Sequence, residues 1–245
     1  GTLIGHLLEC AGQVTGGYFA DPGRKDVEGL ANLGFPYAMI QPNGDAVITK
    51  LAGTGGKVSL QTVKEQLLYE VHDPKNYYTP DCIADFSTAK VEEIGKDQVL
   101  VCGASGKKKP DTLKVSVGYH AGYLGEGEIS YAGSTAVERA ELAERIVKER
   151  LTPVFPELRT DLIGVSSMHH GEFGNYRPYE VRVRAAALCE KKEEAEVIGH
   201  EVEALYTNGP AAGGGARKKV QEIVGIVSTM IDRKQISAEF EIWEG

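Results

Sequence analysis

The sequence contains no apolar run approaching the roughly 18 residues of a membrane-spanning helix, and no secretory signal peptide. It also lacks a net positive charge, because 35 acidic residues outnumber 27 basic ones and leave a formal charge of -8. Nucleic acids and anionic membranes bind proteins that present a basic face, so neither is an expected partner. These absences indicate a soluble, cytoplasmic protein in which any site for an anion is local.

Cysteine is scarce as well, with four residues in the chain and no CxxC pair among them. This pattern is typical of reduced thiols rather than of a disulfide framework or a zinc finger. The chain also has no P-loop and no dinucleotide-binding fingerprint. What it does have is an ordinary globular composition, because 245 residues with 42% hydrophobic content suffice for one large core or two smaller ones.

Apolar periodicity divides the chain into helices and strands. Near-helical spacing predicts helices at 1–14, 57–71, 134–151, 191–209 and 216–223. Alternating or continuous apolar runs predict strands at 35–41, 45–50, 79–86, 98–104, 112–120, 160–167, 179–188, 223–232 and 238–243. The Asn43-Gly44 turn favours a hairpin between the first two strands, and a solvated Lys-rich tip at 106–111 favours a longer hairpin over 98–120.

Strands mixed with crossover helices indicate an α/β or α+β architecture with mixed β-sheet layers. A glycine-rich stretch at 121–134 marks a division, so we expect two subdomains, 1–125 and 126–245. The chain begins without Met and is helical almost from its first residue, with no N-cap before the helix. We therefore expect a fragment or one subunit of a split protein.

Two glycine-rich loops run into predicted helices. One is Gly-Thr-Gly-Gly at 53–56, and the other is Gly-Pro-Ala-Ala-Gly-Gly-Gly at 209–215, directly before a basic run. Glycines let backbone N–H groups converge on an anion, and a helix N-terminus adds positive partial charge. On this interpretation the ligand-binding residues are Lys50, Thr54, Gly55, Gly56, Asn208, Gly213, Gly214, Gly215 and Arg217. The alternative is that both loops are only flexible connections.

The first helix carries an uncommon polar face. Helical spacing gathers on that face His6, Glu9, Cys10 and Gln13, and on the opposite one Leu3, Leu7, Ala11 and Val14. The polar face lacks the Lys and Arg side chains typical of a solvent-exposed surface, which favours the wall of a pocket. His6 would then act as a general acid or base, with Glu9 and Cys10 beside it. A metal site, or a stripe packed on a partner segment, explains the same residues.

A pair of histidines, His169 and His170, follows the strand at 160–167. Catalytic groups often lie at the carboxyl ends of buried strands, so His169 is a further candidate for proton transfer. Neighbouring residues of an extended chain point in opposite directions, so at most one of the pair faces a given site. A polar surface loop is the alternative.

Five stretches of the chain, in this order, carry a family resemblance: GHLLECAGQVTGGYFAD, LANLGFPYAMI, VITKLAGTGGKVSLQTVKEQLLYEVHDPKNYYTPDCIADFS, LRTDLIGVSS and LYTNGPAAGGGARK. In combination they resemble the acyclic terpene utilisation family of the AtuA type, over nearly the whole chain. The resemblance implies a cytoplasmic protein encoded beside enzymes that carboxylate, hydrate and oxidise branched acyl-CoA esters. Members of this family usually carry a further N-terminal α/β region, and many carry a small C-terminal domain, which agrees with a split protein.

The resemblance also implies a ligand, coenzyme A as part of an acyl-CoA substrate, whose phosphates the glycine loops would hold. The acyl end would meet His6, Glu9 or Cys10 in a hydration, lyase or thioester step, and no metal is assigned. Two hypotheses follow. The chain is an enzyme acting on a branched acyl-CoA or its free acid, or it is a noncatalytic binding or assembly subunit that partners a separately encoded N-terminal half. In both cases a homo-oligomer is expected.

Overall fold

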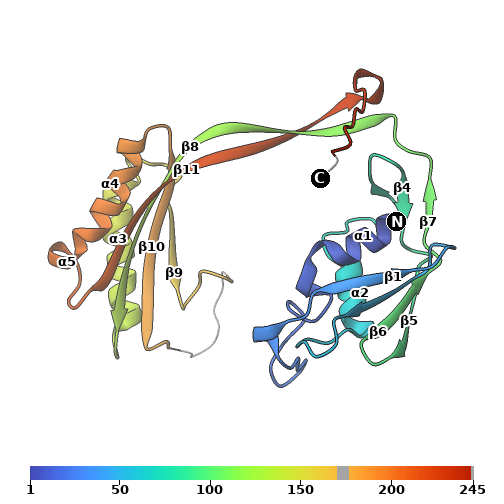
Figure 1. Ribbon diagram of the computed structural model, residues 1–245. Coiled ribbons are helices and arrows are strands. Elements are labelled where there is room, and N and C mark those ends of the chain that lie inside the picture. The colour runs from blue at the N-terminus through green and yellow to red at the C-terminus, as the bar shows by residue number, and fades with distance from the viewer. Residues whose placement is uncertain (170–176, 244–245) are drawn as a thin grey trace. The chain divides into compact units, whose positions relative to one another are not determined.

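The computed structural model describes residues 1–169 and 177–243, and the chain divides into two compact units. Residues 1–113 and 230–245 form the first unit, and residues 114–229 form the second (Figure 1). Antiparallel sheets accompanied by separate helices make this an α+β fold. Across the described residues, no helix is long and apolar enough to cross a membrane.

The first unit contains a four-stranded sheet of order β1-β2-β6-β5 and a three-stranded sheet of order β3-β4-β7. All of their strand pairs are antiparallel. The strands are β1 Pro36–Ile40, β2 Ala46–Lys50, β3 Tyr77–Tyr78, β4 Ile83–Asp85, β5 Lys90–Gly95, β6 Gln98–Cys102 and β7 Ser105–Lys107. The helices are α1 Thr2–Glu9 and α2 Leu60–Leu68, with short 3-10 turns η1 Ala11–Gln13, η2 Leu30–Asn32 and η3 Arg233–Gln235.

The core of the first unit lies between the helices and the four-stranded sheet. Leu7 of α1 and Val63 of α2 are fully buried together with Ile48 of β2. Burial of such side chains stabilises a fold by about 1.5–3 kcal/mol each. The expected hairpin between β1 and β2 is confirmed by the pairing of Ile40 with Ala46.

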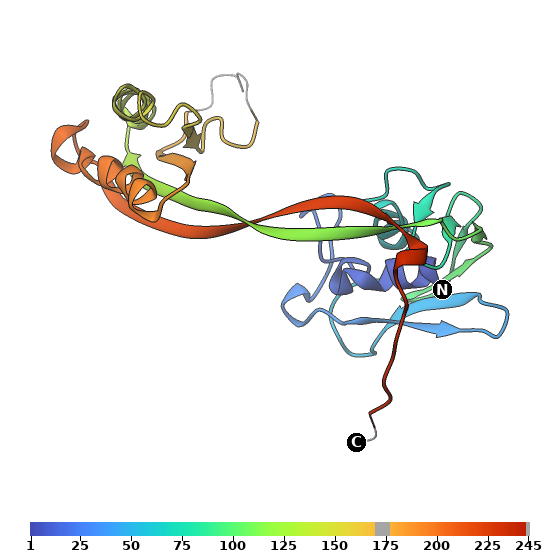
Figure 2. The same cartoon turned by 90° about the horizontal axis from the view of Figure 1, so that it is seen from above.

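The second unit is a four-stranded sheet of order β11-β8-β10-β9 with helices on one face (Figures 1 and 2). The strands of this sheet are β8 Thr112–Ala132, β9 Arg159–Ile163, β10 Glu180–Cys189 and β11 Gly214–Asp232, and the first two residues of β8 and the last three of β11 belong to the first unit. Its helices are α3 Ala136–Leu151, α4 Lys192–Glu203 and α5 Leu205–Asn208. In both views β8 and β11 lie side by side as a long ribbon.

Sequence periodicity explains how this second core forms. Every second residue of β10 is buried, including Val181, Val183 and Ala185, so one face of the strand is apolar. The buried positions of α3 recur at helical spacing, from Ala136 to Leu151, and they pack against that face. The predicted helices at 134–151 and 191–209 and the predicted strand at 179–188 are thereby confirmed.

One expectation about the middle of the chain is wrong. The hairpin over 98–120 does not form, since β6 pairs with β2 and β5 instead. Most of the glycine-rich stretch at 121–134 continues β8. A Cβ at Gly125 would come within 2.1 Å of the Ala195 carbonyl oxygen, so glycine there lets α4 lie against the strand.

Two expectations near the end of the chain are also wrong. Residues 216–223 lie in β11 and not in a helix, because pairing with β8 overrides the local helical pattern. Residues 238–243 form no helix or strand within the part of the chain that the structure describes. The premise that a helix N-terminus follows the second glycine loop therefore fails.

Candidate functional site

His6 of α1 is buried rather than exposed on a polar helix face. Only 6% of the residue is accessible, and its ring lies 5.4 Å from that of Tyr77 and 5.7 Å from that of Phe86 between centroids. The Nδ1 atom lies 3.7 Å from Glu9 Oε2, and neither ring nitrogen has a hydrogen-bond partner among the described residues. Burial, followed by the charge of Glu9, raises the pKa of Tyr77.

The structure thus brings His6 and Glu9 together, while Cys10 caps the end of α1 and is half-buried. Glu9 points largely into solvent, with 65% of its side chain accessible. Because aromatic rings enclose His6, its surroundings resemble those of a core residue more than those of a residue that lines a pocket. No group of His, Cys, Asp and Glu able to hold a metal ion occurs within the described residues.

The first glycine loop makes backbone hydrogen bonds to neighbouring segments of the protein. The Gly55 N–H donates to the Asn32 carbonyl at 2.8 Å, and the Gly56 N–H donates to the Glu28 carbonyl at 2.8 Å. Lys50 is buried and donates from Nζ to the Thr54 carbonyl at 2.8 Å. These donors already have acceptors, so the loop does not offer them to an anion.

The second glycine loop packs over the end of the second core. A side chain at Gly213 would meet Ile129 and Tyr131, both of which are buried. Arg139 of α3 donates from Nη1 to the Ala211 carbonyl at 2.9 Å and also bonds the Ala132 carbonyl, which ties the loop to the end of β8. Asn208 ends α5 before the loop, and after it Gly214, Gly215 and the exposed Arg217 already belong to β11.

His169 lines a cavity of about 240 Å³ formed by residues 164–169, directly after β9. The cavity begins beside the start of β10, where a side chain at Gly164 would lie 3.2 Å from the Glu180 carbonyl oxygen. His170 lies outside the described residues. His169 and the second glycine loop therefore share the second unit, whereas His6, Lys50 and the first glycine loop belong to the first.

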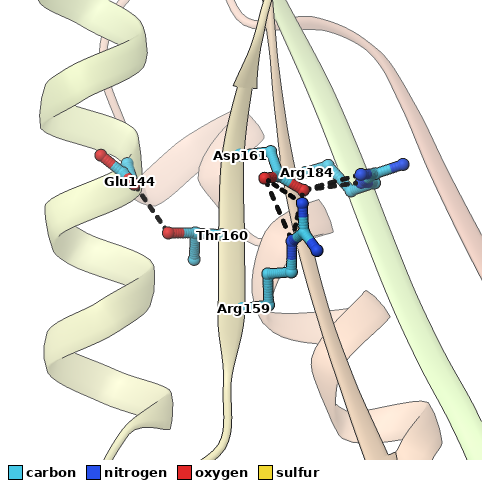
Figure 3. A network of polar contacts seen from close by, with 5 residues as sticks. All are labelled: Glu144, Arg159, Thr160, Asp161 and Arg184. Atoms are coloured by element: carbon cyan, nitrogen blue, oxygen red, sulfur yellow. Dashed lines mark hydrogen bonds and ion pairs between the residues drawn. The ribbon is translucent and has the colours of Figure 1, made fainter. Parts of the chain in front are cut away.

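A cluster that sequence reasoning missed lies on the face of the second sheet that α3 and α4 leave open. Asp161 of β9 is only 4% accessible and accepts hydrogen bonds from two guanidinium groups (Figure 3). Arg184 donates from Nη2 at 2.7 Å, and Arg159 donates from Nε and Nη2 at 3.2 Å. Next along β10, Arg182 donates to Glu128 at 3.3 Å.

The electrostatics of the cluster follow from these contacts. Burial acts to raise the pKa of the Asp161 carboxyl, but the hydrogen bonds from Arg184 and Arg159 outweigh it, and the pKa lies below its ordinary value. On the helix side of β9, Thr160 donates to Glu144 of α3 at 2.6 Å and fixes the strand to the helix (Figure 3). The aspartate is therefore ionised at neutral pH and accepts hydrogen bonds from both arginines.

The guanidinium groups of the cluster remain partly exposed. Asp161 is shared between Arg159 and Arg184, Arg182 pairs with Glu128, and the charge of Glu126 also acts on Arg184, so the three arginines of this face are balanced by three carboxylates. About a third of the Arg184 side chain and 62% of the Arg159 side chain remain accessible. Guanidinium groups bind carboxylates and phosphates through paired N–H donors. The alternation of arginines in YEVRVRAAAL was the available signal, since it places Arg182 and Arg184 on one strand face.

These features define an α+β protein of two units, one of which presents a buried aspartate clamped by two arginines on an open sheet face. The chain belongs to the acyclic terpene utilisation family, because residues 1–242 match the model of the acyclic terpene utilisation family protein AtuA. No curated protein and no solved structure matches the chain.

Proposed function

We propose that this chain binds a branched carboxylic acid or its coenzyme A ester during terpene catabolism, with the anionic end held at Arg159 and Arg184. Membership of the family supports the substrate class. The observation that carries the proposal is the sharing of one carboxylate, Asp161, between two accessible guanidinium groups. In a chain of net charge -8, guanidinium groups with accessible N–H donors are the feature that an acidic ligand would seek.

The cavity after β9 gives such a ligand room beyond its charged end. Gly164, where the cavity begins, is three residues from Asp161, a distance of about 10 Å along an extended strand. His169 lines this cavity, whereas His6 is enclosed by aromatic rings. A hydration, lyase or thioester step needs a proton donor or acceptor, and we assign that role to His169 ahead of His6, Glu9 and Cys10.

Thermal unfolding with and without ligands tests the proposal. Branched acyl-CoA, coenzyme A, free branched acids and the uncharged amides of those acids are compared at rising concentration. The melting temperature should rise with the acids and CoA compounds, since a ligand bound only to the folded state stabilises it. The amides should produce a much smaller shift because they lack the carboxylate.

The decisive variant is Arg159→Gln, which removes one guanidinium and leaves Arg184 on Asp161. We expect it to weaken the ligand-induced shift, whereas Arg145→Gln, an exposed arginine of α3, should leave the shift unchanged. An equal response to acid and amide, or an undiminished shift in Arg159→Gln, would contradict an anion site at this cluster.

A further inference from the structure

The last described residues of the chain, 236–243, belong to no helix or strand. Residues 236–242 alternate between apolar and polar side chains, and Trp243 ends the alternation. Phe240 and Ile242 are 87% and 82% accessible. An alternating segment of this kind is typical of a strand that covers one face.

A matching unpaired edge exists in the second unit. β11 is the outermost strand of its sheet, so one side of it has no strand neighbour within the described chain. Beside it lies a groove of about 270 Å³, between α4 and β11, lined by Glu196, Gly199, His200, Lys218, Lys219 and Val220. Lysines on an edge strand discourage pairing with most other strands, but they favour an acidic one.

The charges and side-chain spacings of the two segments match. Arg217 and Lys219 are two residues apart and therefore lie on one face of β11, opposite Ala216 and Val220, which pack on the core. In 236–243 the two glutamates, Glu239 and Glu241, are also two residues apart. Antiparallel or parallel pairing can thus place two acids beside two bases, and opposite charges on neighbouring strands stabilise each other.

The same pairing would bury the apolar face of the segment. Ala238, Phe240 and Ile242 alternate with the glutamates, so they emerge on the side where Val220 and the groove lie. Lys218 contributes its aliphatic stem there, because its Nζ is held by Glu203 of α4 at 2.6 Å. Phe240 would bury an aromatic ring that is otherwise in solvent.

The segment of the same copy is too short to reach this edge. Lys218 precedes the end of β11 at Asp232 by fourteen residues, which span about 46 Å in an extended strand. Phe240 follows Asp232 by eight residues, whose greatest reach is about 28 Å. The turn at Arg233–Gln235 shortens this reach further. Pairing of residues 236–243 with this part of β11 would therefore need a second copy of the chain.

We propose that residues 236–243 of one copy add as a strand to the free edge of β11 in a second copy, with Glu239 and Glu241 beside Arg217 and Lys219. Reciprocal exchange between two copies makes a twofold dimer. The proposal is independent of the ligand and gives a reason for the basic run that follows the second glycine loop.

Charge exchange between two variants tests this pairing. One variant carries Glu239→Lys and Glu241→Lys, and the other carries Arg217→Glu and Lys219→Glu. The unmodified chain should self-associate in sedimentation equilibrium, less strongly at high salt. Each variant alone should associate about tenfold more weakly or worse, because like charges face each other. An equimolar mixture should recover association, since the basic segment of the first variant meets the acidic edge of the second.

Lys90→Glu on β5, an exposed edge of the first unit, is the matched control and should associate like the unmodified chain. Circular dichroism establishes that every variant is folded. A monomeric unmodified chain at all concentrations would overturn the proposal. Undiminished association of either charge-reversed variant alone would also overturn it, because self-association would then use another surface. A mixture of the two variants that does not recover association would overturn it as well.

Discussion

Asp161 of β9 and Arg184 of β10 are directly opposite each other in adjacent antiparallel strands, and the Arg184 Nη2 donates to Asp161 Oδ2 at 2.7 Å. Arg159 approaches the same carboxylate from within β9. A carboxylate that is 4% accessible depends on such donors for its solvation. The pair therefore contributes to the stability of the second unit and holds the Arg184 guanidinium on its open sheet face.

Replacing Asp161 by Asn should destabilise the protein by about 1–3 kcal/mol, because the hydrogen bonds lose their charged acceptor. The folded-state pKa of Asp161 lies below its ordinary value of 3.8. Its ionised form therefore contributes stability that is complete above the ordinary pKa and is lost as the pH falls through the folded-state pKa. The measurement is the free energy of urea-induced unfolding from about pH 7 to about pH 3.

The difference between the unmodified protein and Asp161→Asn should shrink as the pH falls over that range. Glu141→Gln, which changes an exposed carboxylate of α3, is the control for the loss of one negative charge at the surface. A difference that stays constant down to about pH 3 would mean that the ionisation of Asp161 does not stabilise the fold.

Several elements of the fold could be predicted because their signal lies within one segment. α3 buries Ala140, Ala143 and Val147 at helical spacing, and β10 buries alternate residues, so each pattern was readable without knowledge of its partner. The role of a glycine could not be predicted where it allows close contact with a residue far away in the sequence. Gly125 lies within β8, and its lack of a side chain lets α4 approach the strand, a contact that the local sequence does not reveal.

The candidate site was harder to predict than the fold. Asp161 and Arg184 are 23 residues apart, and only the register of β9 against β10 brings them together. Helical spacing correctly put His6 near Glu9, yet it did not reveal that Tyr77 and Phe86, far along the chain, enclose the imidazole. Local periodicity assigns a face to a residue, whereas tertiary packing decides whether that face is open.

Close backbone packing at the first glycine loop predicts opposite outcomes for two Gly-to-Ala substitutions. A Cβ at Gly55 would lie 1.9 Å from the Gly29 carbonyl oxygen, so Gly55→Ala should destabilise the protein by about 1–3 kcal/mol or more. Gly5, within α1, has open space at that position. Gly5→Ala should stabilise the helix by up to about 1 kcal/mol. Chemical denaturation of both variants measures the contrast, and a neutral Gly55→Ala would show that the loop has room to shift.

The burial of His6 predicts that an apolar ring is tolerated in its place. His6→Phe removes two buried nitrogens that lack hydrogen-bond partners among the described residues, so it should be neutral or stabilising. His6→Ala, in contrast, leaves a void beside Tyr77 and Phe86 and should cost about 2–4 kcal/mol. Thermal unfolding compares the two. If His6→Phe is well folded and binds ligand normally but loses turnover, proton transfer belongs to His6 and not to His169.

Cys189 at the end of β10 should be the least reactive thiol of the protein. Burial, followed by the charge of Glu194, raises the pKa of this thiol, so less of the nucleophilic thiolate is present at neutral pH. Cys10, Cys82 and Cys102 are all more accessible. Mass spectrometry after brief iodoacetamide treatment should find those three alkylated first and Cys189 modified only after unfolding. Equally fast labelling of Cys189 in the native protein would show that the end of β10 opens to solvent, because burial is what protects the sulfur.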